Sequence, residues 1–425
     1  MKPLSIVVTI AVTVLVVAIG WMLGPGAAWW LEHVDGVTGL QGEKLAAAVD
    51  AVRGRALAVA TGLAALLALY YTARNADTAR RTFQLGERGH DTDRYSKAAE
   101  QLGHAEAPVR LAGLYALEQL AQNNPALRQR IVDVITAYLR MPYTAPKGDD
   151  RNDAGPAVPR AALGGRTAPP GGRDPHEERQ VRLAAQRILA AHLHHPAPTE
   201  HLRWQRAVST PVEFWSGIRL DLTGALLIDF DFRDCRVNIA SFDRVTFTGV
   251  ASFLRATFTD RASFVGATFT DNASFADATF RSYASFGKAT FTGIALFDRA
   301  AFTGTATFGG ATFTDVTFGG VTFSGGSYFH QATFEGEARF DAVTFSDRSS
   351  FNEAIFRHRA LFTQGLPEQG VDLDGAIVAA EAIGAGHTWP PGWQVIAHGE
   401  KGGVLRKHVP PTTEAEHEAG PELPA

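Results

Sequence analysis

A phenylalanine every five or six residues in the C-terminal half of the chain constrains the fold more than any other feature. From residue 242 to residue 362 this period is unbroken, and two residues before each phenylalanine stands only Ala, Val or Ser. The 23 phenylalanines are Phe242, Phe247, Phe253, Phe258, Phe264, Phe269, Phe275, Phe280, Phe286, Phe291, Phe297, Phe302, Phe308, Phe313, Phe318, Phe323, Phe329, Phe334, Phe340, Phe345, Phe351, Phe356 and Phe362. A large and a small residue two positions apart point to the same side of an extended segment, so we expect both to form an inward-facing structural core.

The residues between these short extended segments are turn formers. Pairs such as Thr-Asp, Asp-Arg and Gly-Gly bend the chain after every strand. Four bends close a square coil of roughly 20 to 22 residues, and stacked coils bury a continuous core. A helix would scatter this period around its circumference, and a lipid-facing strand would show longer alternating runs. The pattern therefore predicts a β-solenoid, which continues upstream to about Leu220 at a strict period of five.

The repeated unit is a small residue, a polar residue, Leu or Phe, and two variable residues, and it resembles the pentapeptide-repeat family. The resemblance implies a right-handed quadrilateral β-helix over 218–380. Its 27 repeat centres, from Leu222 to Phe362, give about six to seven turns at four per coil, or about 30 Å at roughly 4.8 Å per layer. The sequence departs from the family unit by a sixth residue in most alternate repeats, as in ATFTDRASFVG at 256–266. We expect this residue to bulge a corner of the coil.

Two apolar runs lie near the N-terminus, at 4–23 and 56–73, and neither carries a charge. Each has about the length that crosses a bilayer as a helix. The alternatives are a cleaved signal peptide for the first run, whose apolar region is usually shorter, and a buried soluble helix for the second. The arginines that follow the second run favour a multi-pass plasma-membrane protein with both termini and the solenoid in the cytoplasm. These arginines are Arg74, Arg80, Arg81 and Arg88.

Helical periodicity begins near Asp93 and predicts a hairpin of two helices, with a third helix at 180–193. The segment DRYSKAAEQLGHAEAPVRLAGLYALEQLA at 93–121, preceded by YYTARNADTARRTFQLGERG, is similar to a segment in membrane-bound pentapeptide-repeat proteins of actinomycete-type bacteria. In those proteins it lies between the membrane spans and the repeats. The resemblance implies a small HEAT-like helical domain, and it implies no catalytic residue.

The expected fold is α plus β-solenoid, in ten consecutive segments. These are a first transmembrane helix at 1–23, an inter-span loop and helix at 24–55, a second transmembrane helix at 56–73, a helical domain at 74–143, a disordered linker at 144–175, a helix completing the helical domain at 176–203, an N-terminal cap at 204–217, the solenoid at 218–380, a C-terminal cap at 381–400 and a disordered tail at 401–425. The caps are expected because the ends of a solenoid expose strand edges. Trp204, Phe214 and Trp215 supply apolar bulk at one end, and 387–393 supplies it at the other or binds a ligand there.

The sequence contains no motif of an enzyme, a phosphate-binding loop or a paired-cysteine metal site, so we expect no catalytic residue, cofactor or metal. His192, His194, His195 and His201 form the one cluster of potential metal ligands, but they follow a helix, whose C-terminal end favours such side chains in any case. The single cysteine, Cys235, occupies the small inward position of its repeat, where a thiol behaves as a small apolar group.

The charge pattern weighs against a nucleic-acid mimic. The chain has a net charge of −4, and residues 216–365 hold 15 acidic and 13 basic side chains. Some pentapeptide-repeat proteins resemble duplex DNA and modulate or protect DNA gyrase and other topoisomerases, which would need a far more acidic face. The sequence favours instead a non-catalytic, membrane-anchored scaffold that presents an interaction surface to an unidentified cytoplasmic protein.

Overall fold

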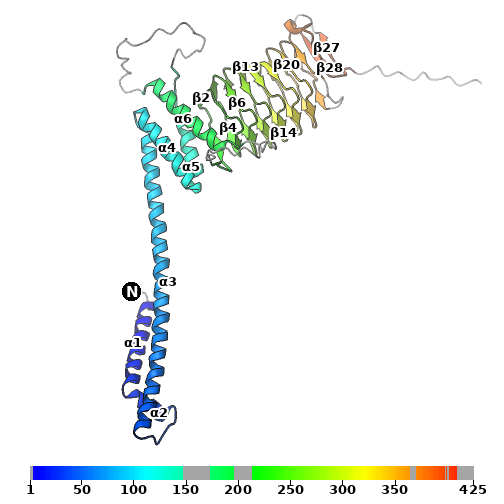
Figure 1. Ribbon diagram of the computed structural model, residues 1–425. Coiled ribbons are helices and arrows are strands. Elements are labelled where there is room, and N and C mark those ends of the chain that lie inside the picture. The colour runs from blue at the N-terminus through cyan, green and yellow to red at the C-terminus, as the bar shows by residue number, and fades with distance from the viewer. Residues whose placement is uncertain are drawn as a thin grey trace, which may run out of the picture. The chain divides into compact units, whose positions relative to one another are not determined.

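The computed structural model describes residues 3–146, 173–195, 213–363, 370–397, 399 and 402–408, without the side chains of 3–9, 11, 12 and 78–90 (Figure 1). The chain divides into two compact units, Met1–Thr92 and Asp93–Ala425. The predicted linker at 144–175 falls for the most part outside the described residues, as do His201, Trp204 and the chain from 409 onward.

The first unit is a helical hairpin with a bend at its closed end. Helix α1 spans Pro3–Leu23 and α2 spans Gly26–His33, and the two meet at 81°. The bend needs glycine at position 26, because a Cβ there would lie 2.5 Å from the Trp21 ring. Ala27 and Leu31 of α2 are buried together with Val52 of the next helix, so α2 is held against that helix.

Helix α3 runs without a break over Glu43–Leu102. The boundaries predicted at 55 and 73 are therefore not helix ends, because no proline interrupts these 60 residues. Among the described residues, one helical segment, Glu43–Asp77, is long and apolar enough to cross a membrane, and it contains the run predicted at 56–73. The part of α1 from Thr13 to Leu23 meets the same criterion only together with α2, as a bent pair.

The helical part of the second unit contains three further helices. Helix α4 spans Ala107–Asn123, and α5, at Arg128–Arg140, follows the short 3-10 helix Pro125–Leu127. Helix α6 spans Pro175–Leu193 and begins five residues before the predicted 180, because the Asp174 side chain accepts a hydrogen bond from the backbone N–H of His176 and caps the helix.

A buried polar network joins these three helices. The Glu178 carboxylate of α6 lies 3.1 Å from Arg110 Nη2 of α4 and 3.0 Å from Arg182 Nε, and it accepts a 2.8 Å hydrogen bond from the Tyr138 hydroxyl of α5. Burial, followed by the Glu178 hydrogen bond, raises the pKa of Tyr138. Charges removed from water must be paired, so this network fixes how the three helices pack.

The C-terminal part is a four-sided β-solenoid of about seven turns, as predicted, and its stacked strands are drawn in green to orange in Figure 1. On the first face lie β1 Arg219–Asp221, β4 Ile239–Ser241, β8 Ala262–Ser263, β12 Ala284–Ser285, β15 Ala306–Thr307, β18 Ser327–Tyr328, β22 Ser349–Ser350 and β25 Val371–Asp372. On the second lie β2 Leu226–Ile228, β5 Thr246–Thr248, β9 Thr268–Phe269, β13 Thr290–Leu296, β16 Thr312–Thr317, β19 Thr333–Phe334, β23 Ile355–Phe356 and β26 Ile377–Val378. The third holds β6 Ala251–Ser252, β10 Ala273–Ser274, the ends of β13 and β16, β20 Ala338–Arg339 and β24 Ala360–Leu361, and the fourth holds β3 Arg236–Val237, β7 Thr257–Phe258, β11 Thr279–Phe280, β14 Ala301–Phe302, β17 Thr322–Phe323 and β21 Thr344–Phe345.

All strands between neighbouring coils pair in parallel, and their register gives the length of a coil. Leu220 pairs with Ala240, and Ala262 pairs with Ala284, so the first coil is slightly shorter than the later one and both lengths lie within the predicted range. The sixth residue of a repeat lies at a corner: the register between β13 and β16 shifts between Phe291 and Ile294, where a six-residue step faces a five-residue step. The coil therefore absorbs the extra residue without losing its pairing.

Phenylalanine rings fill the column, and each of the 23 is at most 4% exposed. Rings in successive coils stack face to face, as do Phe264 and Phe286 with centroids 4.8 Å apart and planes 2° apart. Rings on opposite faces meet edge to face across the column, as do Phe275 and Phe286 at 5.2 Å and 88°. Both geometries suit the charge distribution of an aromatic ring, so each ring adds attraction beyond its apolar burial.

A β-hairpin closes the far end of the column. Strands β27 Trp393–Ala397 and β28 Gly403–Lys407 pair antiparallel, and β28 also pairs with β26. The prediction of a disordered tail from 401 is therefore wrong for β28, because Leu405 is fully buried and its N–H donates to the Ala376 carbonyl at 2.8 Å. Trp389 packs on Phe356 with ring centroids 5.3 Å apart, so this aromatic segment covers the last coil.

The phenylalanine column makes Phe286→Asp strongly destabilising. The carboxylate would lie among six rings with no partner, which we expect to cost at least about 4 kcal/mol and to lower the melting temperature by about 10 °C or more. Circular dichroism of the full-length protein in detergent measures the shift. Arg281→Asp, at an exposed corner position, is the control and should melt like the wild type. Equal melting of the two variants would show that the inward register is wrong.

Candidate functional site

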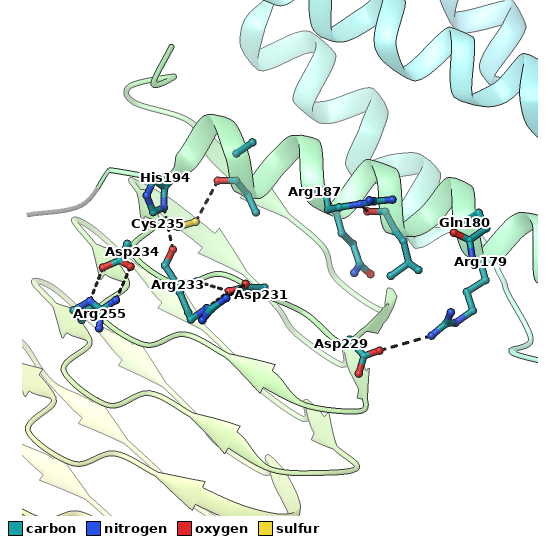
Figure 2. A pocket seen from close by; sticks show the side chains of 14 residues that line it. Arg179, Gln180, Arg187, His194, Asp229, Asp231, Arg233, Asp234, Cys235 and Arg255 are labelled. Atoms are coloured by element: carbon teal, nitrogen blue, oxygen red, sulfur yellow. Dashed lines mark hydrogen bonds and ion pairs between the residues drawn. The ribbon is translucent and has the colours of Figure 1, made fainter. Parts of the chain in front are cut away.

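A groove of about 830 Å³ lies between helix α6 and the first coil of the solenoid (Figure 2). One wall is the α6 face that carries Arg179, Leu183 and Arg187, and the opposite wall is the chain from Asp229 to Cys235. Helix α6 lies there because it covers the open end of the column: its buried residues, including Val181, Ile188 and Leu189, belong to the same apolar core as the phenylalanines.

Two glutamine side chains pair with the first coil as a neighbouring strand would. The Gln129 amide of α5 donates to the Arg219 carbonyl at 2.8 Å and accepts from the Arg219 N–H at 2.9 Å. The Gln186 amide of α6 makes the same pair of bonds with Ile228, at 2.8 and 3.0 Å. A primary amide carries the same donor and acceptor as a peptide group, so the two side chains satisfy edge groups that would otherwise be left unpaired.

The backbone edge at Asp231 is open. The neighbouring residues pair with the next coil, since Phe232 N–H donates to Ser252 O and Ser252 N–H donates to Phe230 O. The N–H and C=O of Asp231 itself have no hydrogen-bond partner within the described ranges, and the residue is exposed. Next along the coil the edge is covered again, because His195 N–H donates to the Asp234 carbonyl at 2.8 Å. The groove thus contains an unpaired strand edge between two covered ones.

Ion pairs line the wall that the solenoid contributes to the groove, as the dashed lines in Figure 2 show. Arg233 forms a bidentate pair with Asp231, and Arg255 forms one with Asp234 at 2.6 and 2.7 Å. These hydrogen bonds hold the pKa of both carboxyl groups below the ordinary value. Arg187, on the α6 wall, has no acidic partner among the residues the structure describes. The side chains that line the groove therefore carry an excess of positive charge.

Cys235 lies beneath the groove but offers no nucleophile. Its side chain is 2% exposed, and the thiol points to the Ala190 carbonyl at 3.4 Å. Burial, with the nearby Asp231 and Asp234 carboxylates, raises the pKa of the thiol. The thiolate is the reactive form of cysteine, so the buried thiol stays protonated and inert at neutral pH.

Comparison with known proteins supports the interpretation of the repeats. Residues 242–290 and 286–332 match the family model of pentapeptide repeats, described as nine copies. The solenoid is built of pentapeptide repeats. A comparison with curated proteins gives no match. Pentapeptide-repeat solenoids are a general type of protein-interaction scaffold and are generally non-enzymatic, so the groove and the outer faces are the surfaces to consider for function.

The structure separates the histidines that the sequence places together. His192 is buried, stacks on Trp215 with centroids 3.9 Å apart, and lies 2.8 Å from the Glu118 carboxylate. The His194 ring lies 3.3 Å from the Arg233 carbonyl at the groove, and the His195 ring stacks on Phe214. Among the described residues, no three His, Cys, Asp or Glu side chains are arranged to hold a metal ion. His192 therefore joins the helices to the chain that enters the pentapeptide-repeat solenoid.

The residues that cover the first coil and line the groove were not predicted from the sequence. Gln186 stands between Ala185 and Ile188 on the apolar side of α6, and a polar residue on such a face is a sign of a buried hydrogen bond. Gln129 lies on α5 and gives no such sign, because its partner Arg219 is 90 residues away. Arg187 is exposed, and in the sequence it cannot be distinguished from other solvent-exposed charged residues.

The glutamine pairing predicts a specific loss of stability in Gln186→Met. Methionine keeps the length of the side chain but cannot pair with the Ile228 N–H and C=O, which we expect to cost about 1 to 3 kcal/mol. Denaturant unfolding of the full-length protein in detergent measures this loss. Gln180→Met, at an exposed position on the same helix, should leave the free energy of unfolding unchanged. If both substitutions cost the same, the Gln186 amide does not cap the coil.

Proposed function

We propose that this chain is a non-catalytic, membrane-anchored scaffold that binds a protein partner through its pentapeptide-repeat solenoid. Support for the anchor comes from the Glu43–Asp77 segment of α3, in which no residue of the most apolar stretch is buried. The Leu57, Leu66 and Leu69 side chains are 56%, 63% and 67% exposed. Such a surface is costly in water and favourable in a lipid bilayer.

The arrangement we propose has two spans, with α1 as the first and the apolar part of α3 as the second. Both termini and the HEAT-like helices would then lie in the cytoplasm of a multi-pass plasma-membrane protein. The arginines after the second span support this orientation, because cytoplasmic flanks carry an excess of Lys and Arg. The helices α4, α5 and α6 would link the anchor to the repeats along the chain.

The groove with its open strand edge is the observation that carries the proposed binding function. Phenylalanine rings fill the interior between residues 242 and 362, so recognition by this segment takes place on its outer surface. An exposed strand edge can accept an extended peptide, whose backbone supplies the missing hydrogen bonds. The N–H and C=O of Asp231 offer such an edge, and Arg187 beside them favours an acidic residue in the partner. A gyrase modulator would need a denser negative surface than one in which Asp234 and Asp277 are each paired with arginine.

The proposed anchor is tested by two measurements on the full chain. We expect the wild type to resist alkaline carbonate extraction, and reporters fused after Gly89 and after Ala425 to be active in the cytoplasm. In Leu66→Arg/Leu69→Arg, each arginine adds about 2.5 to 3.5 kcal/mol to insertion, so α3 should fail to insert and both reporters should move outside. Leu66→Val/Leu69→Val is the apolar control. A carbonate-soluble wild type would refute the anchor.

The proposed partner site is tested by affinity purification from detergent-solubilised membranes. We expect one stoichiometric partner with the wild type and a loss of about tenfold or more with Arg187→Glu, because a removed charge-assisted hydrogen bond costs about 1.5 to 3 kcal/mol. Lys288→Glu makes the same charge change at an exposed corner outside the groove and should keep the partner. Equal recovery with both variants would place the interaction elsewhere.

A further inference from the structure

The first unit contains a second cavity, which the scaffold function does not use. This crevice of about 480 Å³ lies between α1, α2 and α3. Its walls are apolar and come from both long helices: Ala18, Ile19 and Met22 of α1, and Val52, Ala56 and Val59 of α3. Its remaining lining is polar or aromatic and consists of Trp30, Asp35 and Arg55. The crevice thus combines an apolar interior with charged side chains at its opening.

Beyond Arg55, the lining of the crevice becomes purely apolar toward the middle of the two long helices. On α3, Arg55 immediately precedes the uncharged run, and Val59 lies four residues further on, or about 6 Å along the helix. Helix α1 runs in the opposite direction (Figure 1), so the step from Met22 back to Ala18 leads the same way. Both walls become purely apolar toward the middle of the proposed spans. A phospholipid has this same order of groups, from a charged phosphate to an apolar chain.

The mouth of the crevice carries the side chains expected at a membrane surface. Helix α2 is bent by 81° from α1, so it lies close to the plane of the bilayer if α1 crosses it. Trp21, Trp29 and Trp30 are 45%, 47% and 36% exposed, and tryptophan is enriched at the level of the lipid headgroups. The charged end of the crevice therefore lies at headgroup depth.

The Arg55 guanidinium has N–H donors that the Asp35 carboxylate does not occupy. Its closest acidic group, the Asp35 carboxylate, is 3.9 Å from Nη1, and the Arg55 side chain is 75% exposed. The neighbouring Arg53 lies nearer to its own partner, Asp50, at 3.4 Å on the same helix. A guanidinium presents five N–H donors in a planar fork, which matches the oxygens of a phosphate group.

We propose that the crevice binds an anionic phospholipid, with an acyl chain between α1 and α3 and the phosphate on Arg55. This inference rests on the proposed membrane anchor. It assigns the loop end of the hairpin a role in lipid selection: a net-negative headgroup is retained by Arg55, and Trp30 packs beside the glycerol region. Arg53 lies outside the crevice lining and takes no part in binding.

Native mass spectrometry of the purified full-length protein tests the site, with phosphatidylglycerol and phosphatidylcholine added in detergent. We expect the wild type to retain phosphatidylglycerol in preference to phosphatidylcholine. Arg55→Gln should reduce bound phosphatidylglycerol about tenfold, the effect of one lost charge-assisted hydrogen bond, and Arg53→Gln should not. Ala56→Trp, which fills the crevice without changing charge, should reduce binding of both lipids.

Three outcomes decide the inference. Selective loss in Arg55→Gln and Ala56→Trp supports the site. Equal phosphatidylglycerol binding in Arg55→Gln and Arg53→Gln overturns it, whether both bind like the wild type or both lose the lipid through general loss of charge. Carbonate extraction of the same variants separates this failure from failure of the anchor: a retained anchor with equal binding refutes the crevice alone, whereas a soluble wild type removes the premise of both.

Discussion

Contact between phenylalanine rings is the interaction on which the solenoid depends. Most strands are only two or three residues long, so a single strand contributes few backbone hydrogen bonds. Each ring compensates by touching rings above, below and beside it, as Phe286 does with Phe264, Phe308, Phe275 and Phe297. The small residue two positions earlier leaves space for these rings, and the polar residue between them faces outward. One short pattern thus specifies backbone direction, core and surface together.

A column of this kind needs different solutions at its two ends, since each end exposes edge groups that no further coil can satisfy. At the start, helices supply side-chain amides, because a helix cannot offer its own backbone groups to a strand. At the far end, β28 offers a real strand and Leu405 offers apolar cover. The backbone edge at Asp231 is left open because each helix side chain satisfies the backbone groups of a single residue, whereas a paired strand satisfies those of several.

Sequence reasoning predicted the solenoid well because its signal is local. The inward pairs, such as Ala262 and Phe264, lie two positions apart, and the spacing from one pair to the next gives the length of a coil directly. The contacts that cover the first coil are long-range in the chain: Gln129 meets Arg219 across 90 residues, and Gln186 meets Ile228 across 42. Such a pair of distant residues produces no periodic pattern in the sequence. The strand at Gly403–Lys407 was not predicted for the same reason, because it pairs with the distant Ile377 and Val378 of β26. The continuity of α3 was not predicted because the run at 56–73 marks the apolar part of a helix and not its ends.

The equivalence of the coils separates the length of the column from its ends. Ala262, Ala284 and Ala306 occupy the same place in successive coils, and the coil from Ala306 to Ser327 keeps its pairing with one residue fewer. A duplicated or deleted block of one coil would leave every ring with its neighbours and both covers with their partners. Evolution can therefore lengthen or shorten the outer surface of the solenoid by whole coils, while the groove beside the first coil stays the same.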